Sequence, residues 1–315
     1  MRSTPKHKKE IAVIIPCYNE AKSIKKVIQD FKKELPEATI YVFDNNSTDH
    51  THKIAEDSGA IVYSENRQGK GNVVRTAFRT IKADCYLLVD GDDTYSAKDA
   101  LKLCQPILDN SADMVIGDRL SSSYYTENKR PFHNIGNKTV SFLINKIFKS
   151  HINDIMTGYR AMTYEFVKSF PILSKGFEIE TEMAIFAVDK NFRIIETPIF
   201  YKDRASDNPS KLNTYSDGFR VLKTIAVLFK EYKPSIFFNI VSTLFYIIAI
   251  ILGIPILIEY FQTGLVPRLP TLIISSFLVI IGILLNITGL ILQVVVKKDR
   301  QLYELFFNLI QIDKH

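Results

Sequence analysis

The segment CYLLVDGDD, residues 85–93, is an apolar run that ends in carboxylates around one glycine. A short apolar run of this kind, closed by turn-forming residues, is typical of a strand buried in a sheet. Three similar runs precede it in the chain, IAVIIPCYN at 11–19, TIYVFDNNSTD at 39–49 and IVYSEN at 61–66. Helix-like segments fill the intervals, at about 20–35, 51–60 and 69–81. This alternation of strands and helices predicts an α/β fold with a mostly parallel sheet.

Polar residues follow three of the predicted strands at the point where each strand ends. They are Tyr18-Asn19-Glu20, Asp44-Asn45-Asn46 and Asp90-Gly91-Asp92-Asp93. The carboxyl ends of parallel strands meet at one edge of a sheet, and ligands bind at that edge. We therefore expect the three clusters to lie together and to form one site.

The acidic cluster predicts a site for a divalent cation. Asp90 and Asp92 stand on either side of a glycine, directly after an apolar strand. Hard oxygen ligands suit Mg²⁺ or Mn²⁺, and a cation held there neutralises charge on a departing diphosphate. Asp93 has two readings, as a further ligand or as the N-cap of a helix that starts near Ala97.

Two further features at the strand ends favour a nucleotide. Asp44 is placed to accept a hydrogen bond from a nucleobase N–H; the alternative is a helix cap near Ser47 and Asp49. The turn Gly69-Lys70-Gly71 predicts backbone N–H groups and one ammonium near a phosphate. The turn is not a Walker loop, because the spacing GxxxxGK[ST] is absent from the sequence.

Two long apolar runs lie toward the C-terminus, at 235–261 and 271–296. Within and between them only Glu259 and Arg268 are charged. A helix needs about 20 apolar residues to span a bilayer, so both runs are long enough. The sequence therefore predicts a hairpin of two transmembrane helices.

Basic residues gather just outside both apolar runs and predict their orientation. They are Lys230, Lys233, Lys297, Lys298 and Arg300. The positive-inside rule places these flanks in the cytoplasm, together with both termini. The apolar run near the N-terminus, residues 11–15, is too short for a signal peptide, so we expect the N-terminal domain to stay in the cytoplasm.

Residues 217–233 predict an amphipathic helix that lies on the membrane surface, because apolar residues share one helical face and cationic residues flank it. The alternative is a helix packed on its own domain. Residues 138–149 show the same pattern more weakly.

The 315-residue chain carries a net charge of +6 and has a pI of about 9.0. This balance favours anionic partners, or it reflects the basic cytoplasmic flanks that membrane proteins carry. The apolar runs argue against a nucleic-acid binder. Cys17, Cys85 and Cys104 form no CxxC pair, which predicts neither a disulfide framework nor a zinc site and favours a reducing compartment.

Taken together, the motifs resemble the family-2 glycosyltransferases of the GT-A fold. The motifs are IIPCYNE, DNNSTD, GKGN, VDGDDTY, GDR, DIMTGYR at 154–160, and YKDR with SKLN within 201–213. Within this family the chain is similar to the polyprenyl-phosphate branch, the dolichol-phosphate mannose synthases and the bacterial undecaprenyl-phosphate glucosyl- and N-acetylglucosaminyltransferases. The resemblance covers residues 11 to about 230.

The resemblance implies an inverting transfer of a hexose from UDP-N-acetylglucosamine or UDP-glucose to undecaprenyl phosphate. It places this reaction at the cytoplasmic face of the cell membrane, in cell-wall or surface-glycan modification. It also implies a Rossmann-like nucleotide-sugar domain, a metal cofactor (Mg²⁺ or Mn²⁺) and a homo-oligomer such as a tetramer. The expected domains are a catalytic domain at 1–215, an interfacial helix at 216–234, two membrane helices at 235–296 and a tail at 297–315.

The resemblance also assigns roles to single residues of this chain. The nucleoside would contact Pro16, Tyr18, Glu20 and Asp44, with Lys70 nearby. The diphosphate and metal would contact Asp90 and Asp92. The acceptor phosphate and the diphosphate would contact Arg119, Arg130, Arg204 and Lys211. Each arginine could instead form a surface salt bridge.

Two more acids, Asp154 and Glu180, are predicted to accept hydrogen bonds from sugar hydroxyls. Their alternative is to pair with Arg160 or to cap helices.

Three rival functions are weaker. A processive polysaccharide synthase would carry a QxxRW motif, and the chain has no tryptophan. A transferase with a hydroxyl acceptor needs a general base, whereas a phosphate acceptor is already largely ionised near neutral pH. A non-catalytic membrane scaffold would carry a broken acidic motif, and the motif here is intact.

Overall fold

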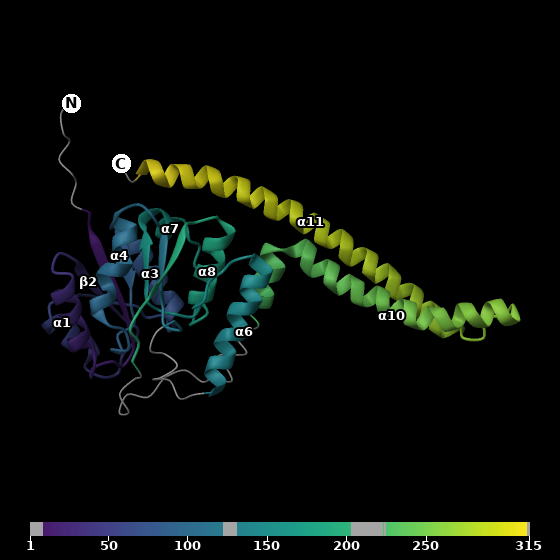
Figure 1. Ribbon diagram of the computed structural model, residues 1–315, viewed down its shortest axis with the longest axis horizontal. Helices are drawn as coiled ribbons and strands as arrows, with labels where there is room; N and C mark the ends of the chain where they lie inside the picture. Colours follow the sequence, from purple (N-terminus) through teal and green to yellow (C-terminus); the bar gives the residue numbers. More distant parts are fainter. Residues whose placement is uncertain (1–8, 122–130, 203–222, 224, 314–315) are drawn as a thin grey trace. The chain divides into compact units, whose positions relative to one another are not determined.

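The computed structural model describes residues 9–121, 131–202, 223 and 225–313 (Figure 1). It forms two compact units. The first comprises Met1–Thr224 with Phe306–His315, and the second comprises Ile225–Leu305.

The first unit is built on a seven-stranded sheet with the order β3-β2-β1-β4-β6-β5-β7. The strands are β1 (Ile11–Cys17), β2 (Thr39–Asp44), β3 (Ile61–Ser64), β4 (Cys85–Leu88), β5 (Met114–Asp118), β6 (Arg160–Thr163) and β7 (Ile194–Pro198). All pairings are parallel except those of β6, which runs antiparallel to both β4 and β5. The predicted mostly parallel α/β sheet is confirmed.

Helices connect the strands of this unit. They are α1 (Ile24–Glu34), α2 (Thr51–Asp57), α3 (Lys70–Thr80), the 3-10 turn η1 (Ala97–Asp99), α4 (Ala100–Leu108), α6 (Pro131–Phe148), α7 (Tyr164–Ser169) and α8 (Ile179–Asp189). The helix expected from Glu20 begins only at Ile24. The N–H groups of Ser23 and Ile24 both donate to the Glu20 carbonyl, at 3.0 and 2.9 Å, so residues 20–23 form a turn before the helix.

The core lies on both faces of the sheet. On one face, the apolar sides of α1 and α4 pack against the strands. Phe31 of α1 and Leu103 of α4 belong to the same buried cluster as Ile15 of β1 and Leu87 of β4. On the other face Phe78 of α3 packs edge-on against Tyr86 of β4, with ring centroids 6.2 Å apart. Every side chain of β4 is buried, which explains why its sequence is a continuous apolar run rather than an alternating one.

The strand register brings distant parts of the chain to one edge. Cys17 at the end of β1 pairs with Asp44 at the end of β2, so the first two polar clusters are neighbours. Because β6 is antiparallel, its first residue, Arg160, lies opposite Leu88, the last residue of β4. The chain that leads into β6 therefore arrives beside the acidic cluster. Arg160 also pairs with Ile116 near the end of β5, which brings the residues after β5 to the same edge.

Arg160 itself is fully buried and fixes the segment before β6. Its guanidinium donates to the carbonyls of Ile155 (2.5 Å) and Thr157 (3.1 Å) and lies 3.8 Å from the Met114 sulfur. Burial lowers the pKa of Arg160 to about 10, so the guanidinium stays charged at neutral pH. The predicted alternative pairing of Arg160 with Asp154 or Glu180 is wrong, since carbonyl oxygens take its hydrogen bonds and those two acids form ion pairs with other residues.

The second unit contains the long helix α10 (Pro234–Thr263) and the part of the long helix α11 (Leu269–Asp313) up to Leu305. Each has a mean hydropathy of 2.6 over its most apolar window and is long and apolar enough to cross a membrane. Only 17% of that window in α10 and 11% in α11 is buried, unlike the core helix of a soluble protein. At about 1.5 Å per residue, the 45 residues of α11 extend about 67 Å, more than a hydrocarbon core of roughly 30 Å.

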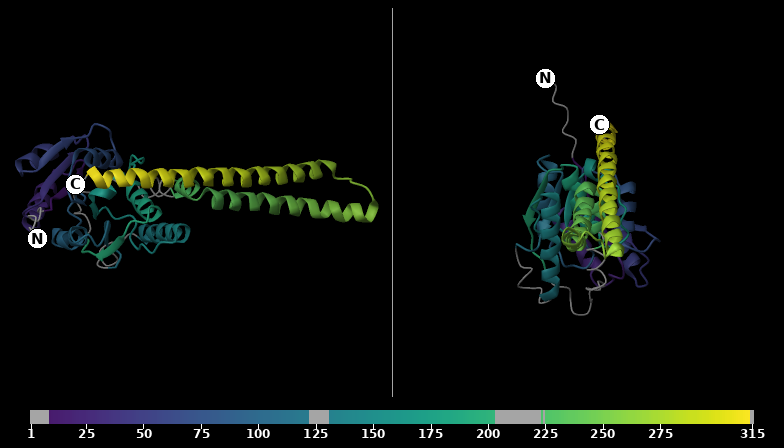
Figure 2. Two further views of the ribbon diagram at one scale, coloured as in Figure 1. Left: turned by 90° about the horizontal axis from the view of Figure 1, so that it is seen from above. Right: turned by 90° about the vertical axis from the view of Figure 1, so that its right-hand side faces the viewer.

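The helices α10 and α11 run side by side (Figure 2), and polar side chains join them. The Ser242 hydroxyl donates to the Asn286 side-chain oxygen at 2.5 Å, and the Asn286 amide donates to the Tyr246 hydroxyl at 3.0 Å. The Ser275 hydroxyl donates to the Ala249 carbonyl at 2.9 Å. In lipid, where apolar contact gives little preference between helices, such bonds fix the register of the pair.

The two segments predicted to lie on the membrane surface have different outcomes. In α6 the side chains of Val140, Ile144 and Phe148 are buried, so this face packs within the protein, while Phe142 is 63% exposed. For the segment 217–233, residues 217–222 and 224 lie outside the described residues, and its surface role stays a prediction.

Replacing Arg160 with methionine should destabilise the first unit, because two buried carbonyls lose their donor. We expect a loss of about 3 kcal/mol, which corresponds to a Tm lower by roughly 6–12 °C for a domain of this size. Thermal unfolding of the detergent-purified protein measures it.

The matched control is Arg193→Met, which removes a guanidinium that pairs with Asp113 at the surface, where its side chain is 56% exposed. This variant should lose no more than about 1 kcal/mol. Equal Tm shifts in the two variants would contradict the role given to Arg160.

Candidate functional site

The acidic turn after β4 is held in place by its own hydrogen bonds. One oxygen of Asp92 accepts from the Thr94 backbone N–H (3.1 Å) and from the Thr94 hydroxyl (2.6 Å). A Cβ atom at Gly91 would lie 2.6 Å from the Cys17 sulfur, so only glycine lets the turn approach the end of β1 this closely. The turn thereby presents Asp90 and Asp92 at the predicted edge of the sheet.

Lys70 links this turn to two other elements. Its ammonium lies 2.5 Å from Asp90 and 2.7 Å from Glu180 of α8, and the Lys70 and Glu180 side chains are 6% exposed. Burial alone would lower the pKa of Lys70, but the two carboxylates outweigh it and hold that pKa above its usual range. Burial raises the pKa of Glu180, and the Lys70 charge partly offsets this. Lys70 is therefore a permanent cation between two acids.

Gly158, just before β6, packs against this ion pair. A Cβ atom there would lie 2.6 Å from the second oxygen of Asp90 and 2.9 Å from the Lys70 nitrogen. The Gly158 N–H donates to the Tyr95 hydroxyl at 3.0 Å. Tyr95 is buried, and burial raises its pKa to about 12, so it stays a neutral hydroxyl at physiological pH. The glycine backbone thus forms one wall around Asp90.

Arg119 and Asp154 form a buried, two-pronged ion pair beside the same edge. The Arg119 Nε lies 2.7 Å from one Asp154 oxygen, and its Nη2 lies 2.9 Å from the other. The Arg119 backbone N–H donates to the same carboxylate at 3.1 Å. The guanidinium also lies over the Tyr201 ring, 5.5 Å from its centroid. These contacts fix the orientation of the Arg119 guanidinium.

The residues expected to hold the nucleoside lie at the ends of β1 and β2. Tyr18 is 39% exposed, whereas Glu20 and Asp44 are buried. The Glu20 N–H donates to the Thr51 hydroxyl at 2.8 Å, which ties the end of β1 to the start of α2. Pro16 is half-buried in β1.

Asp44 accepts from the backbone N–H of Ser47 at 3.3 Å and lies 3.7 Å from the His52 ring. Ser47 precedes α2, which begins at Thr51 with His50 as its N-cap residue, so the alternative prediction of Asp44 as a helix cap is wrong. The Ser47 contact engages one oxygen of the carboxylate and shapes the turn after β2.

Asn45 organises the site, although no sequence pattern distinguishes it from the other residues of its cluster. Its amide donates to the carbonyls of Glu65 and Arg67, both at 2.8 Å. Its oxygen accepts from the Gly69 N–H at 2.7 Å. Asn45 therefore joins the end of β2 to the loop that carries Lys70. An amide immediately after a strand end is the signal that could have identified it.

The role predicted for the backbone of Gly69-Lys70-Gly71 is wrong in one respect. The Gly69 N–H donates to Asn45 and the Gly71 N–H donates to the Lys175 carbonyl, so neither is directed to a phosphate. Cβ atoms at Gly69 and Gly71 would lie 2.1 Å from the Lys175 oxygen and 2.3 Å from the Ser174 oxygen. The glycines instead allow residues 174–175 to pack on the turn. The predicted ammonium of Lys70 is present at the site.

Asp93 is not a helix cap. Its backbone is left-handed (φ +62°), and its carboxylate lies 2.9 Å from the Lys26 ammonium and 2.5 Å from that of Lys202. Ser96 caps the turn at Ala97 instead, by accepting from the Lys98 N–H. Asp93 thus pairs with two lysines that carry no predicted role.

Asp154 and Glu180 are brought to the site as predicted, but in ion pairs with Arg119 and Lys70. Three other predicted residues, Arg130, Arg204 and Lys211, lie outside the described residues.

The carboxylates of the acidic turn suit a divalent cation that binds together with substrate phosphates. Among the described residues, no three or more acidic, histidine or cysteine side chains gather into a metal cage. Mg²⁺ and Mn²⁺ are commonly bound by one or two carboxylates together with substrate phosphates and water. Asp90 and Asp92 fit that arrangement, with one oxygen of Asp90 already facing Lys70.

Comparison with known proteins identifies the family and the fold of this chain. Residues 12–170 match the family described as glycosyl transferase family 2. Protein RfbJ of Shigella flexneri is 58% identical over 113 residues, 36% of this chain and 88% of that protein. Glycosyltransferase AglJ of Haloferax volcanii is 34% identical over 233 residues, 74% of this chain and 76% of that protein.

A third relative is the UDP-N-acetylglucosamine–dolichyl-phosphate N-acetylglucosaminyltransferase of Methanococcus voltae. It is 27% identical over 215 residues, 61% of this chain and 85% of that protein.

Among solved structures, glucosyl-3-phosphoglycerate synthase from Mycobacterium tuberculosis superimposes with a TM-score of 0.59 at 19% identity. The match covers 70% of this chain and 79% of that one, which was crystallised with Mn²⁺, UDP-glucose and phosphoglyceric acid. At this identity the likeness concerns the fold, and it confirms the predicted GT-A class. The family match spans half of the chain and AglJ aligns over most of its own length, so this chain belongs to glycosyl transferase family 2 and is a glycosyltransferase.

Proposed function

We propose that this enzyme transfers a hexose from UDP-N-acetylglucosamine or UDP-glucose to undecaprenyl phosphate at the cytoplasmic face of the cell membrane, in cell-wall or surface-glycan modification. The observation that carries the proposal is the convergence of Asp90, Asp92, Lys70 and Arg119 at one sheet edge, in a chain that also has two helices able to cross a membrane.

The relatives support both substrates. One is named for UDP-N-acetylglucosamine and dolichyl phosphate. Another, from Haloferax volcanii, is named a dolichyl-phosphate hexose transferase. A structure of the same fold holds Mn²⁺ and UDP-glucose, which is consistent with a divalent cation here. A lipid acceptor is consistent with the two apolar helices, because the acceptor stays in the bilayer while its phosphate reaches the enzyme.

The proposed roles follow the geometry of the strand edge. Asp90 and Asp92 hold the cation, Mg²⁺ or Mn²⁺, against the diphosphate. When bound, the cation neutralises the charge that develops on the leaving diphosphate. Lys70 adds a fixed positive charge beside Asp90. Pro16, Tyr18, Glu20 and Asp44 hold the nucleoside at the ends of β1 and β2.

The acceptor side relies on cations. Arg119 faces the acceptor phosphate in the orientation that Asp154 fixes, because a guanidinium fork matches phosphate oxygens. Arg130, Arg204 and Lys211 complete this group. Asp154 and Glu180 also lie within reach of sugar hydroxyls in the proposal, while their carboxylates hold Arg119 and Lys70.

The proposed reaction is a direct displacement. A phosphate oxygen of the acceptor forms a bond to the anomeric carbon while the bond from that carbon to the diphosphate oxygen breaks, and UDP leaves with the electron pair. No general base is required, because the second pKa of a phosphate monoester is about 6. The protein's task is to reduce the repulsion between two anions. A single displacement inverts the configuration at the anomeric carbon.

The proposed topology follows from the basic flanks of the two membrane helices. A catalytic domain at 1–215 and an interfacial helix at 216–234 precede the spans at 235–296, with the tail at 297–315 and both termini in the cytoplasm. A homo-oligomer, such as a tetramer, belongs to the same proposal. The alternative of a non-catalytic scaffold is disfavoured by the intact acidic turn and by membership of the family.

The donor and acceptor can be tested together. Detergent-purified enzyme is incubated with undecaprenyl phosphate, Mg²⁺ and radiolabelled UDP- and GDP-sugars, and label in the organic phase is counted. We expect label from UDP-N-acetylglucosamine or UDP-glucose, and EDTA should abolish it. The anomeric configuration of the same product should be opposite to that of the donor.

Label from a GDP-sugar alone would overturn the donor assignment. A folded enzyme that labels no lipid from any donor would overturn the acceptor assignment. A product that retains the donor's configuration would exclude a single displacement.

Adjacent carboxylates of the acidic turn offer a matched pair of variants. Asp92→Asn should lower kcat/KM on the order of a hundredfold, because a metal contact supplies several kcal/mol of transition-state stabilisation. Asp93→Asn should stay within a few-fold of the wild type, since Asp93 faces Lys26 and Lys202 and asparagine tolerates its positive φ. Equal losses in the two variants would argue against Asp92 as a metal ligand.

Gly158→Ala tests the wall beside Asp90. The added methyl group would displace Asp90 or Lys70, so we expect the metal concentration for half-maximal activity to rise at least about tenfold. The control is Gly176→Ala, whose Cβ would meet only the movable end of the Glu178 side chain. An unchanged metal requirement in Gly158→Ala, with an unchanged Tm, would contradict the arrangement.

A further inference from the structure

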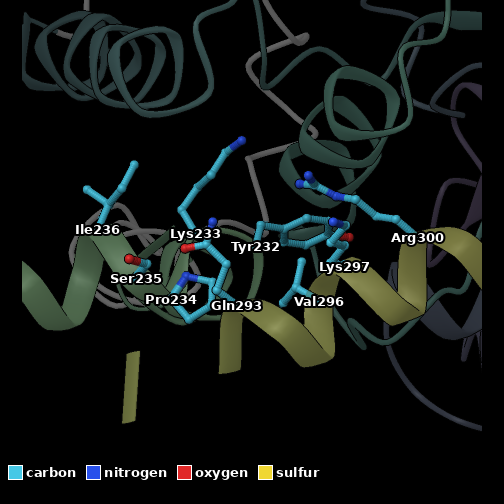
Figure 3. A pocket seen from close by; sticks show the side chains of 9 residues that line it. All are labelled: Tyr232, Lys233, Pro234, Ser235, Ile236, Gln293, Val296, Lys297 and Arg300. Atoms are coloured by element: carbon cyan, nitrogen blue, oxygen red, sulfur yellow. The ribbon is translucent and has the colours of Figure 1, made fainter. Parts of the chain in front are cut away.

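The hairpin unit contains a cavity of about 370 Å³ between the start of α10 and one face of α11 (Figure 3). Three cationic side chains line it, Lys233, Lys297 and Arg300, together with the polar Tyr232 and Gln293. None of its nine lining residues is acidic. The cavity is large enough for a ligand, since binding clefts commonly start at about 300 Å³.

The lining of the cavity follows from helical spacing. Gln293, Val296, Lys297 and Arg300 recur at intervals of three and four residues, so they share one face of α11. Lys298 comes between two of them in the chain, but it is exposed and does not line the cavity. Within residues 297–300 the helix therefore directs Lys297 and Arg300 to the cavity, whereas Lys298 and the acidic Asp299 do not line it.

The place of the cavity along the hairpin indicates the class of its ligand. From Pro234 to Val296 the chain carries only Glu259 and Arg268 as charged residues, and the cavity lies at the end of this apolar section, where basic residues resume. In a membrane, the end of an apolar helix pair lies at the level of the lipid headgroups, where tyrosine side chains also concentrate. Basic pockets between membrane helices at this level bind phosphate-bearing headgroups.

The apolar part of the lining agrees with a lipid rather than a free anion. Pro234, Ile236 and Val296 form walls of the same cavity. A headgroup phosphate bound by the cations would place its acyl chains along the outer faces of α10 and α11, where large apolar side chains such as Ile240 (60% exposed) face outward. A free phosphate ion has no apolar part, so these apolar residues would not add to its binding free energy.

We propose that this cavity binds the phosphate headgroup of an anionic glycerophospholipid of the bilayer. The headgroup would lie between the first turn of α10 and the face of α11 that carries Lys297 and Arg300. This site goes beyond the proposed function, which assigns the acceptor phosphate to Arg119, Arg130, Arg204 and Lys211. It requires that the hairpin lies in a membrane and does not depend on which sugar is transferred.

The test measures lipid binding directly, without a sugar donor. Full-length protein is delipidated in detergent and titrated with phosphatidylglycerol, and the bound lipid is counted by native mass spectrometry. Lys297→Gln with Arg300→Gln should weaken binding about thirtyfold, since each cation near a membrane surface contributes roughly a five- to sixfold effect. Lys298→Gln, the matched control, removes the same charge one residue away and should bind as the wild type does.

Two further binding measurements distinguish a phospholipid headgroup from undecaprenyl phosphate and from free inorganic phosphate. Undecaprenyl phosphate should bind equally to the double variant and the wild type, and inorganic phosphate should not compete with phosphatidylglycerol at millimolar concentration. A Tm equal to that of the wild type checks the fold. If the double variant does not fold, Lys297→Gln alone should show a loss of about fivefold.

Three results would overturn the proposal. Equal phosphatidylglycerol binding by the wild type and the folded variants would show that the cavity is not the site. An equal loss in Lys298→Gln would indicate diffuse surface charge. A loss of undecaprenyl phosphate binding in the double variant would assign the cavity to the acceptor. Because no transfer is measured, these outcomes are independent of whether the proposed reaction is correct.

Discussion

The candidate site depends on one buried ion pair network, the Lys70 ammonium between Asp90 and Glu180. It joins the start of α3 and the end of β4, which are consecutive elements, to the first turn of α8, which lies far from them in the chain. Lys70 and Glu180 are buried, and a lone buried charge is strongly unfavourable, so each of these two side chains requires the other, while the partly exposed Asp90 adds a second carboxylate beside the ammonium. The same requirement keeps a cation next to the carboxylate that is proposed to hold the metal. Gly158 and Asn45 serve this network by leaving room beside it and by fixing the loop that carries Lys70.

The features that could be predicted from the sequence are those set by local patterns. Apolar runs identified β1, β2, β3 and β4, and helical spacing identified α1, because periodicity reports which faces are buried. The acidic turn was found since its polar residues directly follow an apolar strand. Pairings between segments that are distant in the chain could not be predicted from the sequence. Arg119 and Asp154, 35 residues apart, meet only because β6 is inserted antiparallel between β4 and β5.

Errors in the local predictions have the same physical origin. Asp93 looks like a helix cap from its spacing, but Lys26 and Lys202 offer it charged partners. The glycines around Lys70 resemble a phosphate-binding turn, yet the backbone of residues 174–175 takes the space beside them. Both outcomes are decided by residues that are remote in sequence. The pair of apolar helices able to cross a membrane, by contrast, was predictable because length and hydropathy are sums over many residues and tolerate local error.

The late position of β6 in the chain has a consequence for synthesis on the ribosome. β4 ends at Leu88, and its neighbour β6 begins only at Arg160, so one edge of the nascent sheet stays unpaired while about 70 further residues are made. At roughly 5–20 residues per second this interval is on the order of 4–14 seconds, far longer than the time for collapse of a small chain. During it, four apolar residues of an open strand are available to other chains. The nascent protein is thus most prone to aggregate, and most dependent on chaperones, after the acidic turn at Asp90 and Asp92 has been translated but before β6 has.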